Sequence, residues 1–420
     1  MRINKYLPIA LLYFFVNSLG LPFGLTYTAL LSPFLYRYAV YARKQEVMWP
    51  FFLVLTPLVI IHLVMGVDNK SYFISLLNMT TVYIFCQAFY TFLQKCEHPE
   101  AVFKPILVIN FVLCIVAIPL FFTSQHWLWS QQFLTTGVRD FKRLSLFTYE
   151  PSYYALLFTP LFLYFFLQII FKQIAGNVWL LLTMLFLPYI LSFSLGVISA
   201  LVIAALVTFV VYFKTLISNR RVVNIILMAG IAAITALVVT LIFFPDNILF
   251  VRIANVLNGK DPSGKGRTFE AFWLAQQLLE QKSYLWGIGP GQIKILGFDL
   301  IRDYYGYGKD TIRVAIPNAA AETLAVFGYV GLTVRILVEC VLFFYTRVWT
   351  NYYRLLLFVF VFVYQFTGSF ITNIAEYVIW IMAFTRVFQQ FDFKKGSGQA
   401  AIGSGKKAPG NPSTTLRANR

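Results

Sequence analysis

Long apolar segments recur along this chain and constrain its fold more than any other feature. A helix needs about 20 mostly apolar residues to cross a bilayer, with a range of roughly 17 to 25. Each apolar segment of about this length therefore predicts one transmembrane helix. These segments lie at 48–66, 72–93, 105–122, 153–171, 177–194, 196–213, 222–244 and 322–345.

Two other apolar segments are too long for one span and predict two helices each. Residues 6–41 are apolar throughout but break at 20–24 (Gly-Leu-Pro-Phe-Gly), which favours a tight hairpin. Residues 355–384 carry Gly368 and a group of polar side chains near their middle. The total is about 12 spans, and 11 to 13 fit the pattern. We therefore expect an all-α polytopic membrane protein.

The composition favours a membrane surface over nucleic acid as the partner of the basic residues. The 420-residue chain is 59% hydrophobic and 12% charged, with a formal net charge of +17. The charged fraction is about half that of a soluble domain. The basic residues lie at the edges of apolar segments, where Lys and Arg hold helix ends against anionic headgroups.

The same residues predict the orientation of the chain. With the N-terminus inside, sixteen Lys and Arg lie at inner edges and four in short outer loops. Because cytoplasmic loops carry an excess of Lys and Arg, both termini are expected in the cytoplasm. The inner group is Arg2, Lys5, Arg37, Arg43, Lys44, Lys95, Lys104, Lys172, Lys214, Arg220, Arg221, Arg347, Arg354, Arg386, Lys394 and Lys395, and the outer group is Lys70, Arg139, Lys142 and Arg143.

Spans and loops divide the chain into four parts. Residues 1–244 hold the first nine predicted spans, with an outer loop at 123–152. Residues 245–321 form one large outer loop with short helices, and residues 322–393 hold the last three spans. Residues 394–420 are rich in Gly, Ser, Pro and Lys, and their low apolar content predicts a disordered cytoplasmic tail.

Glu150 lies where the first outer loop re-enters the membrane, in the sequence Tyr149-Glu-Pro-Ser-Tyr-Tyr154. Pro151 suits the first turn of a helix, and a helix N-terminus favours an anion, so Glu150 could be only a capping carboxylate. The functional alternative is a carboxylate beside a cavity that takes a proton from an incoming hydroxyl. The sequence leaves both interpretations open.

Residues 268–285 of the large outer loop predict an amphipathic helix whose apolar side carries Phe269, Phe272, Trp273 and Leu279. This helix either lies in the headgroup plane above a cavity or packs on the outer ends of the spans.

A glycine-rich segment, Gly287-Ile-Gly-Pro-Gly291, follows that helix. It predicts a tight turn that returns the chain to the membrane, with a backbone nest for an anionic headgroup as the alternative. Pro290 and the missing strand–helix–strand context argue against a nucleotide site.

Arg335 lies near the middle of the span that begins near Glu322. A cation there costs roughly 2.5–3.5 kcal/mol, so it should face a polar cavity or an acidic partner. Glu339, four residues further on, Glu322 and Glu376 on the last span are the candidate partners. A structural ion pair and a functional site both remain open.

Two groups of basic residues flank the re-entry point on the outer side. Singly, each residue is most simply a solvated surface cation. Together they could clamp a pyrophosphate, which suits guanidinium geometry. The first group is Arg139, Lys142 and Arg143, and the second is Arg252, Lys260, Lys265 and Arg267.

The order of these motifs resembles the O-antigen polymerase and ligase superfamily, specifically the Wzy-type polymerases. One dominant outer loop follows many spans, and Glu-Pro-Ser-Tyr at 150–153 opens a central span. Arg267 precedes an amphipathic stretch that ends in the glycine-rich segment, and the loop closes as Pro317-Asn-Ala-Ala-Ala-Glu-Thr-Leu-Ala-Val-Phe-Gly-Tyr-Val-Gly-Leu332. The resemblance covers most of residues 139–345, whereas the N-terminal third is similar only in hydropathy.

This resemblance implies a helical bundle like that of GT-C glycosyltransferases, in the bacterial inner membrane, with its active face in the periplasm. The implied activity joins oligosaccharide repeat units carried on undecaprenyl pyrophosphate, as donor and acceptor, into O-antigen or a similar surface polysaccharide. No cofactor and no metal are implied, because arginines can absorb the charge of the leaving pyrophosphate. The implied partners are membrane lipids, a chain-length regulator and a flippase, and nucleic acid is not among them.

The resemblance and the charges together assign roles to single residues. Glu150, Arg267 and Arg335 are the predicted catalytic residues. Glu150 would activate or orient the acceptor hydroxyl, and Arg267 would hold the pyrophosphate with Arg139 or Arg143. The other predicted substrate-binding residues are Tyr153, Arg313, Asn318 and Glu322.

Two rival functions stay open. A ligase would transfer finished glycan to lipid A core, but ligases and many polymerases show a His-Asn pair where this chain has Pro317-Asn318. This difference favours a polymerase and leaves the general base unassigned. A flippase for the same repeat units should show two similar halves. Residues 1–210 and 211–395 show no such repeat, and the polar residues gather on one face, which favours an enzyme.

Overall fold

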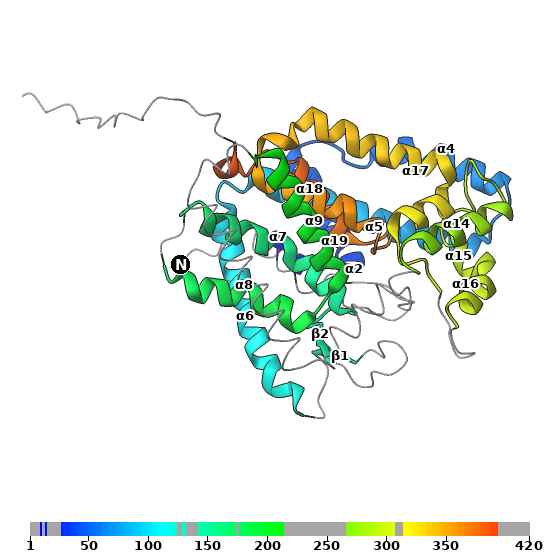
Figure 1. Ribbon diagram of the computed structural model, residues 1–420. Helices are drawn as coiled ribbons and strands as arrows, with labels where there is room; N and C mark the ends of the chain where they lie inside the picture. The colour runs from blue at the N-terminus through cyan, green and yellow to red at the C-terminus, as the bar shows by residue number, and fades with distance from the viewer. Residues whose placement is uncertain are drawn as a thin grey trace, which may run out of the picture.

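The computed structural model describes residues 9–10, 13–14, 27–123, 128–131, 142–173, 176–213, 266–306 and 314–393, which are mostly helical (Figure 1). In these residues, four helices are long and apolar enough to cross a membrane: α5 (Asn69–Lys95), α6 (Pro99–Phe121), α7 (Pro151–Ile170) and α17 (Ala319–Thr346). The shorter apolar helices are α4 (Trp49–Val64), α8 (Val178–Ser192), α9 (Leu195–Val211), α18 (Tyr352–Tyr364) and α19 (Ile374–Phe384). The expectation of a mainly helical membrane protein is confirmed.

The predicted spans between residues 48 and 213 each coincide with one helix, within a few residues at each end. Of the predicted hairpin at 6–41, the structure shows α2 (Tyr27–Leu30) and α3 (Ser32–Arg43). Its break at 20–24, the predicted span at 222–244, the first part of the large loop and the tail lie outside the described residues.

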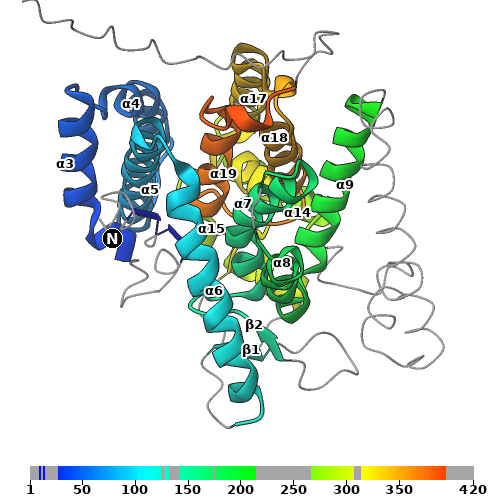
Figure 2. The same ribbon diagram turned by 90° about the vertical axis from the view of Figure 1, so that its left-hand side faces the viewer.

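Helix α7 forms the centre of the bundle and packs against α8, α9, α18 and α19 (Figure 2). Its side chains are buried along almost the whole helix. The Tyr353 hydroxyl of α18 donates to the Pro160 carbonyl of α7 at 3.0 Å, and the Tyr353 ring lies 4.6 Å from that of Phe388. Because an apolar interior provides few hydrogen-bond partners, a buried tyrosine hydroxyl needs such an acceptor.

The predicted division of residues 355–384 is confirmed, since α18 ends at Tyr364 and α19 begins at Ile374. Asn373 caps α19, and its side-chain oxygen accepts from the amides of Ala375 at 2.9 Å and Glu376 at 3.4 Å. With 13 and 11 residues, α18 and α19 are each shorter than a full span.

Helix α17 is interrupted, although the sequence predicts one continuous span at 322–345. Gly328 has φ 66° and ψ −167°, so helical geometry stops there and resumes at the next residue. This backbone region is open essentially only to glycine. The side chains before the break are buried, whereas many after it are exposed and apolar.

The glycine-rich segment fills the break in α17. The amides of Ile288 and Gly289 donate to Ala325 O and Val326 O, both at 2.9 Å. In return, the amides of residues 329 and 330 donate to the carbonyls of Tyr284 and Leu285 at 2.9 and 3.2 Å. The Gly287 amide donates to the Ser283 carbonyl at 3.0 Å, so three amides of this segment are engaged and cannot bind an anion. The segment is therefore a structural turn.

Three helices of the large loop, α14 (Phe269–Glu280), α15 (Ile293–Leu296) and α16 (Phe298–Tyr305), lie beside the first half of α17 (Figure 1). We call residues 266–306 the outer unit. The predicted amphipathic helix exists as α14, but of the four residues expected on its apolar side only Leu279 is fully buried and Phe272 half-buried. Phe269 is 88% exposed and Trp273 is 46% exposed. The buried side consists of small and branched residues that allow close packing on α17, namely Ala271, Leu274, Ala275, Leu278 and Leu279.

Side-chain hydrogen bonds fasten the outer unit to α4, α5 and the turn between them, among them that of Lys282 Nζ to the Met65 carbonyl at 3.4 Å. The buried His62 ring makes hydrogen bonds to the Tyr72 hydroxyl at 3.1 Å and to the Trp286 carbonyl at 2.8 Å. The Gln292 side chain accepts from the Asp68 amide at 3.0 Å and donates to the Asp68 carbonyl at 3.1 Å. The glycine-rich segment at the break in α17 is thus held by α17 on one side and by α4 and α5 on the other.

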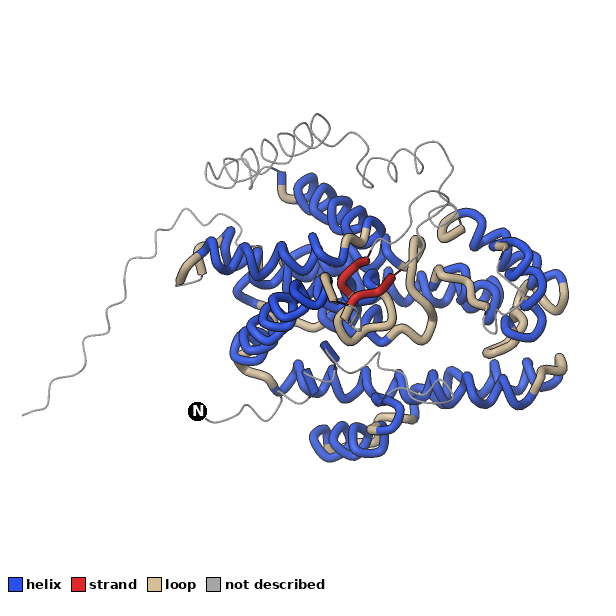
Figure 3. The backbone as a smooth tube through the Cα atoms, turned by 90° about the horizontal axis from the view of Figure 1, so that it is seen from below, coloured by secondary structure: helices blue, strands red, loops and turns tan. Residues whose placement is uncertain are grey.

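A short antiparallel hairpin, β1 (Trp129–Gln131) and β2 (Lys142–Leu144), lies among the helices in the loop before α7 (Figure 3). Trp129 pairs with Leu144. The Trp129 indole also donates to the Ala117 carbonyl of α6 at 2.8 Å. The hairpin therefore fixes the position of the backbone that leads from β2 to Glu150.

Candidate functional site

Glu150 occupies the N-cap position of α7, in an extended conformation, but its carboxylate makes no cap hydrogen bond. Instead, Glu150 Oε1 accepts from the Ser152 hydroxyl and from Arg267. Glu150 therefore lies where a helix N-terminus favours an anion, as the capping interpretation expects, but it caps no backbone amide. The carboxylate is directed to a partner from the outer unit.

Arg267 and Glu150, which are 117 residues apart in the chain, form an ion pair with 3.4 Å between Arg267 Nη2 and Glu150 Oε1. The side chains are 33% and 17% exposed, respectively, so a bound molecule can still reach them. Burial lowers the pKa of Arg267, but the Glu150 carboxylate together with Tyr364 and Tyr149 outweighs burial and raises the pKa above its usual value. The guanidinium remains a permanent cation at this place.

Asn318 fixes the backbone of Arg267. Its side-chain amide donates to the carbonyls of Arg267 at 2.8 Å and Phe366 at 2.7 Å, and its side-chain oxygen accepts from the Ala321 amide at 2.8 Å. Asn318 is fully buried. The structure therefore gives this predicted substrate-binding residue a positioning role, because all its hydrogen-bonding groups serve the protein.

Three tyrosines surround the ion pair. The rings of Tyr149 and Tyr153 lie 4.9 Å apart, and Tyr153 is buried beneath the surface. Tyr364, at the end of α18, lies close enough to interact electrostatically with both Glu150 and Arg267. The sequence did not point to Tyr364. The one nearby sequence feature is Gly368. In the structure an added Cβ at Gly368 would lie 2.9 Å from the Tyr364 ring, so a glycine is needed beside this tyrosine.

Arg335 lies in a buried polar network of α17, α18 and α19. Its Nε donates to Glu339 Oε1 at 3.3 Å and Gln365 Oε1 at 2.8 Å, its Nη1 donates to the Thr323 hydroxyl at 3.1 Å, and its Nη2 pairs with Glu376. The Arg335 side chain is 12% exposed. These contacts support the structural ion pair that the sequence left open, and a catalytic role for Arg335 stays a prediction.

The other predicted site residues serve local structure or lie outside the described residues. Glu322 Oε2 accepts from the Ile371 amide at 2.8 Å. Arg143 is buried on β2 and donates to the Phe193 carbonyl at the end of α8 at 3.4 Å. The residues outside the described part of the chain are Arg139, Arg252, Lys260, Lys265 and Arg313.

The described residues contain no group of three or more His, Cys, Asp or Glu side chains arranged to hold a metal ion. No family model matches the chain, and no curated protein matches it. The resemblance to Wzy-type polymerases thus rests on the sequence motifs, and the activity has to be argued from the geometry of the Glu150–Arg267 site.

Replacing Asn318 with Ala is expected to destabilise the protein more than removing a cap alone. Loss of an N-cap costs about 1 kcal/mol. Asn318→Ala would also leave the buried carbonyls of Arg267 and Phe366 without their donor, at about 1–3 kcal/mol more. Asn177→Ala is the matched control, because within the part of the chain that the structure describes the Asn177 side chain makes only the cap bonds of α8. Thermal unfolding of the purified variants measures the loss of stability in each. Equal decreases in unfolding temperature for Asn318→Ala and Asn177→Ala would contradict the positioning role of Asn318.

Proposed function

We propose that this chain is a membrane glycosyltransferase that polymerises oligosaccharide repeat units linked to undecaprenyl pyrophosphate. In this proposal it crosses the bacterial inner membrane about 12 times, with both termini in the cytoplasm. The Glu150–Arg267 site then faces the periplasm, and the product is O-antigen or a similar surface polysaccharide.

The observation that carries the proposal is the contact between Glu150 and Arg267. A partly exposed carboxylate and a permanent cation meet at the N-terminus of the central helix, and each comes from a different loop. Transfer of a glycan from a lipid pyrophosphate needs one group that handles the acceptor proton and one that stabilises the leaving anion. In this proposal Glu150 handles the acceptor proton and Arg267 stabilises the leaving anion.

The reaction proceeds as follows in this proposal. A hydroxyl oxygen at the non-reducing end of the acceptor repeat unit attacks the anomeric carbon of the donor glycan, and a C–O bond forms. The bond between that carbon and the pyrophosphate oxygen breaks, and the pyrophosphate leaves with the electron pair. The hydroxyl proton passes to Glu150, while Arg267 stabilises the negative charge on the leaving group.

The contacts of Glu150 suit this division of work. In the described part of the chain, both hydrogen bonds to its carboxylate fall on Oε1, which leaves Oε2 for the acceptor hydroxyl. Arg267 uses only Nη2 towards Glu150, so its other guanidinium edge can face a phosphate. The outer unit, which carries Arg267, would cover the bound glycans.

The ligase remains the second candidate, because the same pair of groups could transfer glycan to lipid A core. Pro317 in place of the histidine favours the polymerase. A flippase is disfavoured because the two halves of the chain are not similar and the paired polar side chains from two loops meet at one helix end.

Deletion of the gene followed by analysis of surface polysaccharide tests the proposal. A polymerase predicts that lipid A core carries single repeat units and that long chains return when the gene is restored. Accumulation of long lipid-linked polymer would indicate a ligase. Loss of all repeat units from the outer side would indicate a flippase, and an unchanged polysaccharide would reject all three functions.

A further inference from the structure

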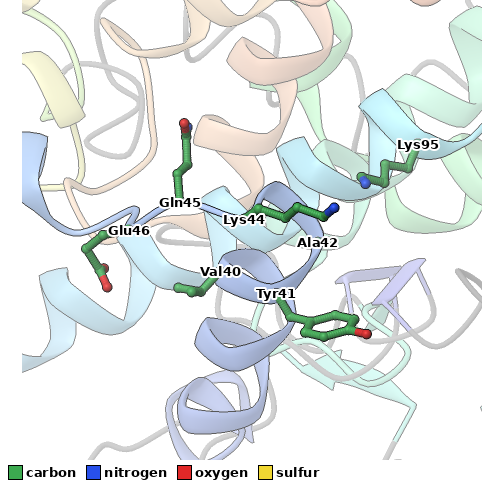
Figure 4. Close-up of a pocket in the computed structure, with 7 residues that line it drawn as sticks. All are labelled: Val40, Tyr41, Ala42, Lys44, Gln45, Glu46 and Lys95. Carbon is green, nitrogen blue, oxygen red and sulfur yellow. The ribbon is translucent and has the colours of Figure 1, made fainter.

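A surface pocket of about 620 Å³ lies far along the chain from Glu150, where α3 and α5 end and α4 begins (Figure 4). The turn between α3 and α4 forms one wall, and the last turn of α5 adds Lys95. The lining residues are Val40, Tyr41, Ala42, Lys44, Gln45, Glu46 and Lys95. The proposed polymerisation uses none of them.

Two unpaired cations dominate this pocket. Lys44 and Lys95 are exposed, and within the described residues neither ammonium group has an ion-pair or hydrogen-bond partner. Figure 4 shows the two side chains pointing towards each other while Glu46 points away. The wall therefore presents two free ammonium groups to whatever enters.

The one acidic residue of the pocket is already occupied. Glu46 Oε2 accepts from the Tyr36 hydroxyl at 2.5 Å, and Glu46 Oε1 accepts from the amides of Val47 at 2.9 Å and Met48 at 3.0 Å. Because these donors hold the carboxylate in the turn before α4, it is not available to neutralise Lys44 or Lys95.

Hydrogen bonds and helix packing fix the backbone around Lys44, so the point from which its side chain leaves the turn is constant. Lys44 ends α3 in a left-handed conformation (φ 58°), and its amide donates to the Val40 carbonyl at 2.8 Å. The neighbouring Arg43 is bound to α5, with Nε donating to the Thr91 hydroxyl at 2.7 Å and Nη1 to Gln87 Oε1 at 2.8 Å. These contacts hold the ends of α3 and α5 together.

Large apolar side chains surround the pocket on the outside of the helices. Tyr41, which lines the pocket, and Trp49, at the start of α4, are each more than 70% exposed. Aromatic side chains at such exposed positions are typical of the membrane–water boundary, and acyl chains can lie against them. By the distribution of basic residues, this boundary is the inner one.

We propose that this pocket binds the phosphate headgroup of an anionic phospholipid of the inner leaflet. Two ammonium groups on a fixed turn suit a phosphate, and exposed aromatic residues beside them suit the acyl chains. Basic pockets between helices on the cytoplasmic side are a known type of site for such headgroups. The site is separate from the Glu150–Arg267 pair and does not depend on the polymerase proposal.

A competing explanation predicts a different experimental result. Lys44 and Lys95 both lie at C-terminal ends of helices, where a cation stabilises the helix dipole without any ligand. In that case their removal lowers thermal stability but does not change lipid selectivity. The experiment must therefore measure lipid retention and stability on the same variants.

Native mass spectrometry of the full chain in detergent tests the proposal, with dioctanoyl phosphatidylglycerol as probe and dioctanoyl phosphatidylcholine as neutral comparison. The unmodified protein should retain phosphatidylglycerol selectively. Lys44→Gln and Lys95→Gln should each weaken its retention about fivefold, and the double variant roughly twenty-five-fold, from the contribution of one lysine near an anionic surface. Lys44→Arg and Lys95→Arg should retain the lipid.

Lys104→Gln is the matched control, because Lys104 is an exposed cation on α6 outside the pocket and carries the same charge. An equal effect of Lys104→Gln would overturn the proposal, as would equal retention of phosphatidylcholine. Unchanged retention with lower thermal stability in the pocket variants would establish the dipole explanation instead. Displacement of the lipid by inorganic phosphate at equal concentration would overturn its assignment to a lipid.

Discussion

Replacement of Glu150 by Gln is expected to lower polymer formation by about 10²–10⁴-fold, which is the usual contribution of a positioned general base. Glutamine keeps the size of the side chain and an oxygen for Arg267 Nη2, but it cannot take the proton of the acceptor hydroxyl. Arg267→Ala removes the cation beside the leaving pyrophosphate and is expected to cost about 10²–10³-fold. The length distribution of surface glycan on gels, at matched protein levels, measures both changes.

Glu280→Gln is the control for the first change, since Glu280 is an exposed carboxylate at the end of α14 away from Glu150. For the second, Arg267→Lys keeps the charge but loses the two-pronged geometry, so it should restore part of the activity. Normal glycan ladders in both Glu150→Gln and Arg267→Ala would remove the basis of the proposed mechanism.

Replacement of Gly328 by Ala is expected to destabilise the protein by about 3–5 kcal/mol, among the largest effects of a single substitution. The new Cβ would lie 2.2 Å from the Leu285 carbonyl oxygen, and the backbone would have to keep φ 66° and ψ −167°. Gly287→Ala would disturb the same contact between the glycine-rich segment and α17, because its Cβ would lie 2.4 Å from Val326 O. Thermal unfolding and the yield of folded protein measure the loss.

Gly306 provides the matched control for backbone strain. It also has a positive φ, 62°, but among the described residues no atom lies within 4 Å of the position that its Cβ would take. Gly306→Ala should therefore cost only about 1–2 kcal/mol, the usual penalty for a left-handed residue with a side chain. If Gly328→Ala unfolds at the same temperature as Gly306→Ala, the contact with Leu285 does not contribute as described.

Much of the helical framework could be predicted from sequence because apolar length is a strong signal for a span. The interruption at Gly328 could not, because Gly-Tyr-Val-Gly lies inside an apolar segment and nothing local distinguishes a break from a tolerated glycine. The cause is distant, since the carbonyls of Tyr284 and Leu285 replace the helical partners. For α14, both sides are apolar, and packing on α17 selected the side with the small residues instead of the aromatic one.

Only the charged residues of the candidate site could be predicted from the sequence. Glu150 and Arg267 lie at sequence positions where a helix start and a loop end can be recognised, and the structure brings them into contact. Tyr364 joins them from the end of α18, directly after nine consecutive apolar residues (355–363), so its role depends on tertiary packing. Arg335 was predicted as a site residue because it lies near the middle of a predicted span. The sequence could not show that four side chains already bind its guanidinium group.

The break in α17 also has a consequence for the order in which the protein is assembled. The amides of Tyr329 and Val330 have their partners in the outer unit. Without those partners they would enter lipid unbonded, at several kcal/mol each. The carbonyls of Tyr284 and Leu285 precede them in the chain and are therefore synthesised first. The segment that carries Tyr284 and Leu285 thus acts as an internal template. Its carbonyls are present before the second half of α17 is synthesised, and that half can enter an apolar environment with its amides bonded only beside them.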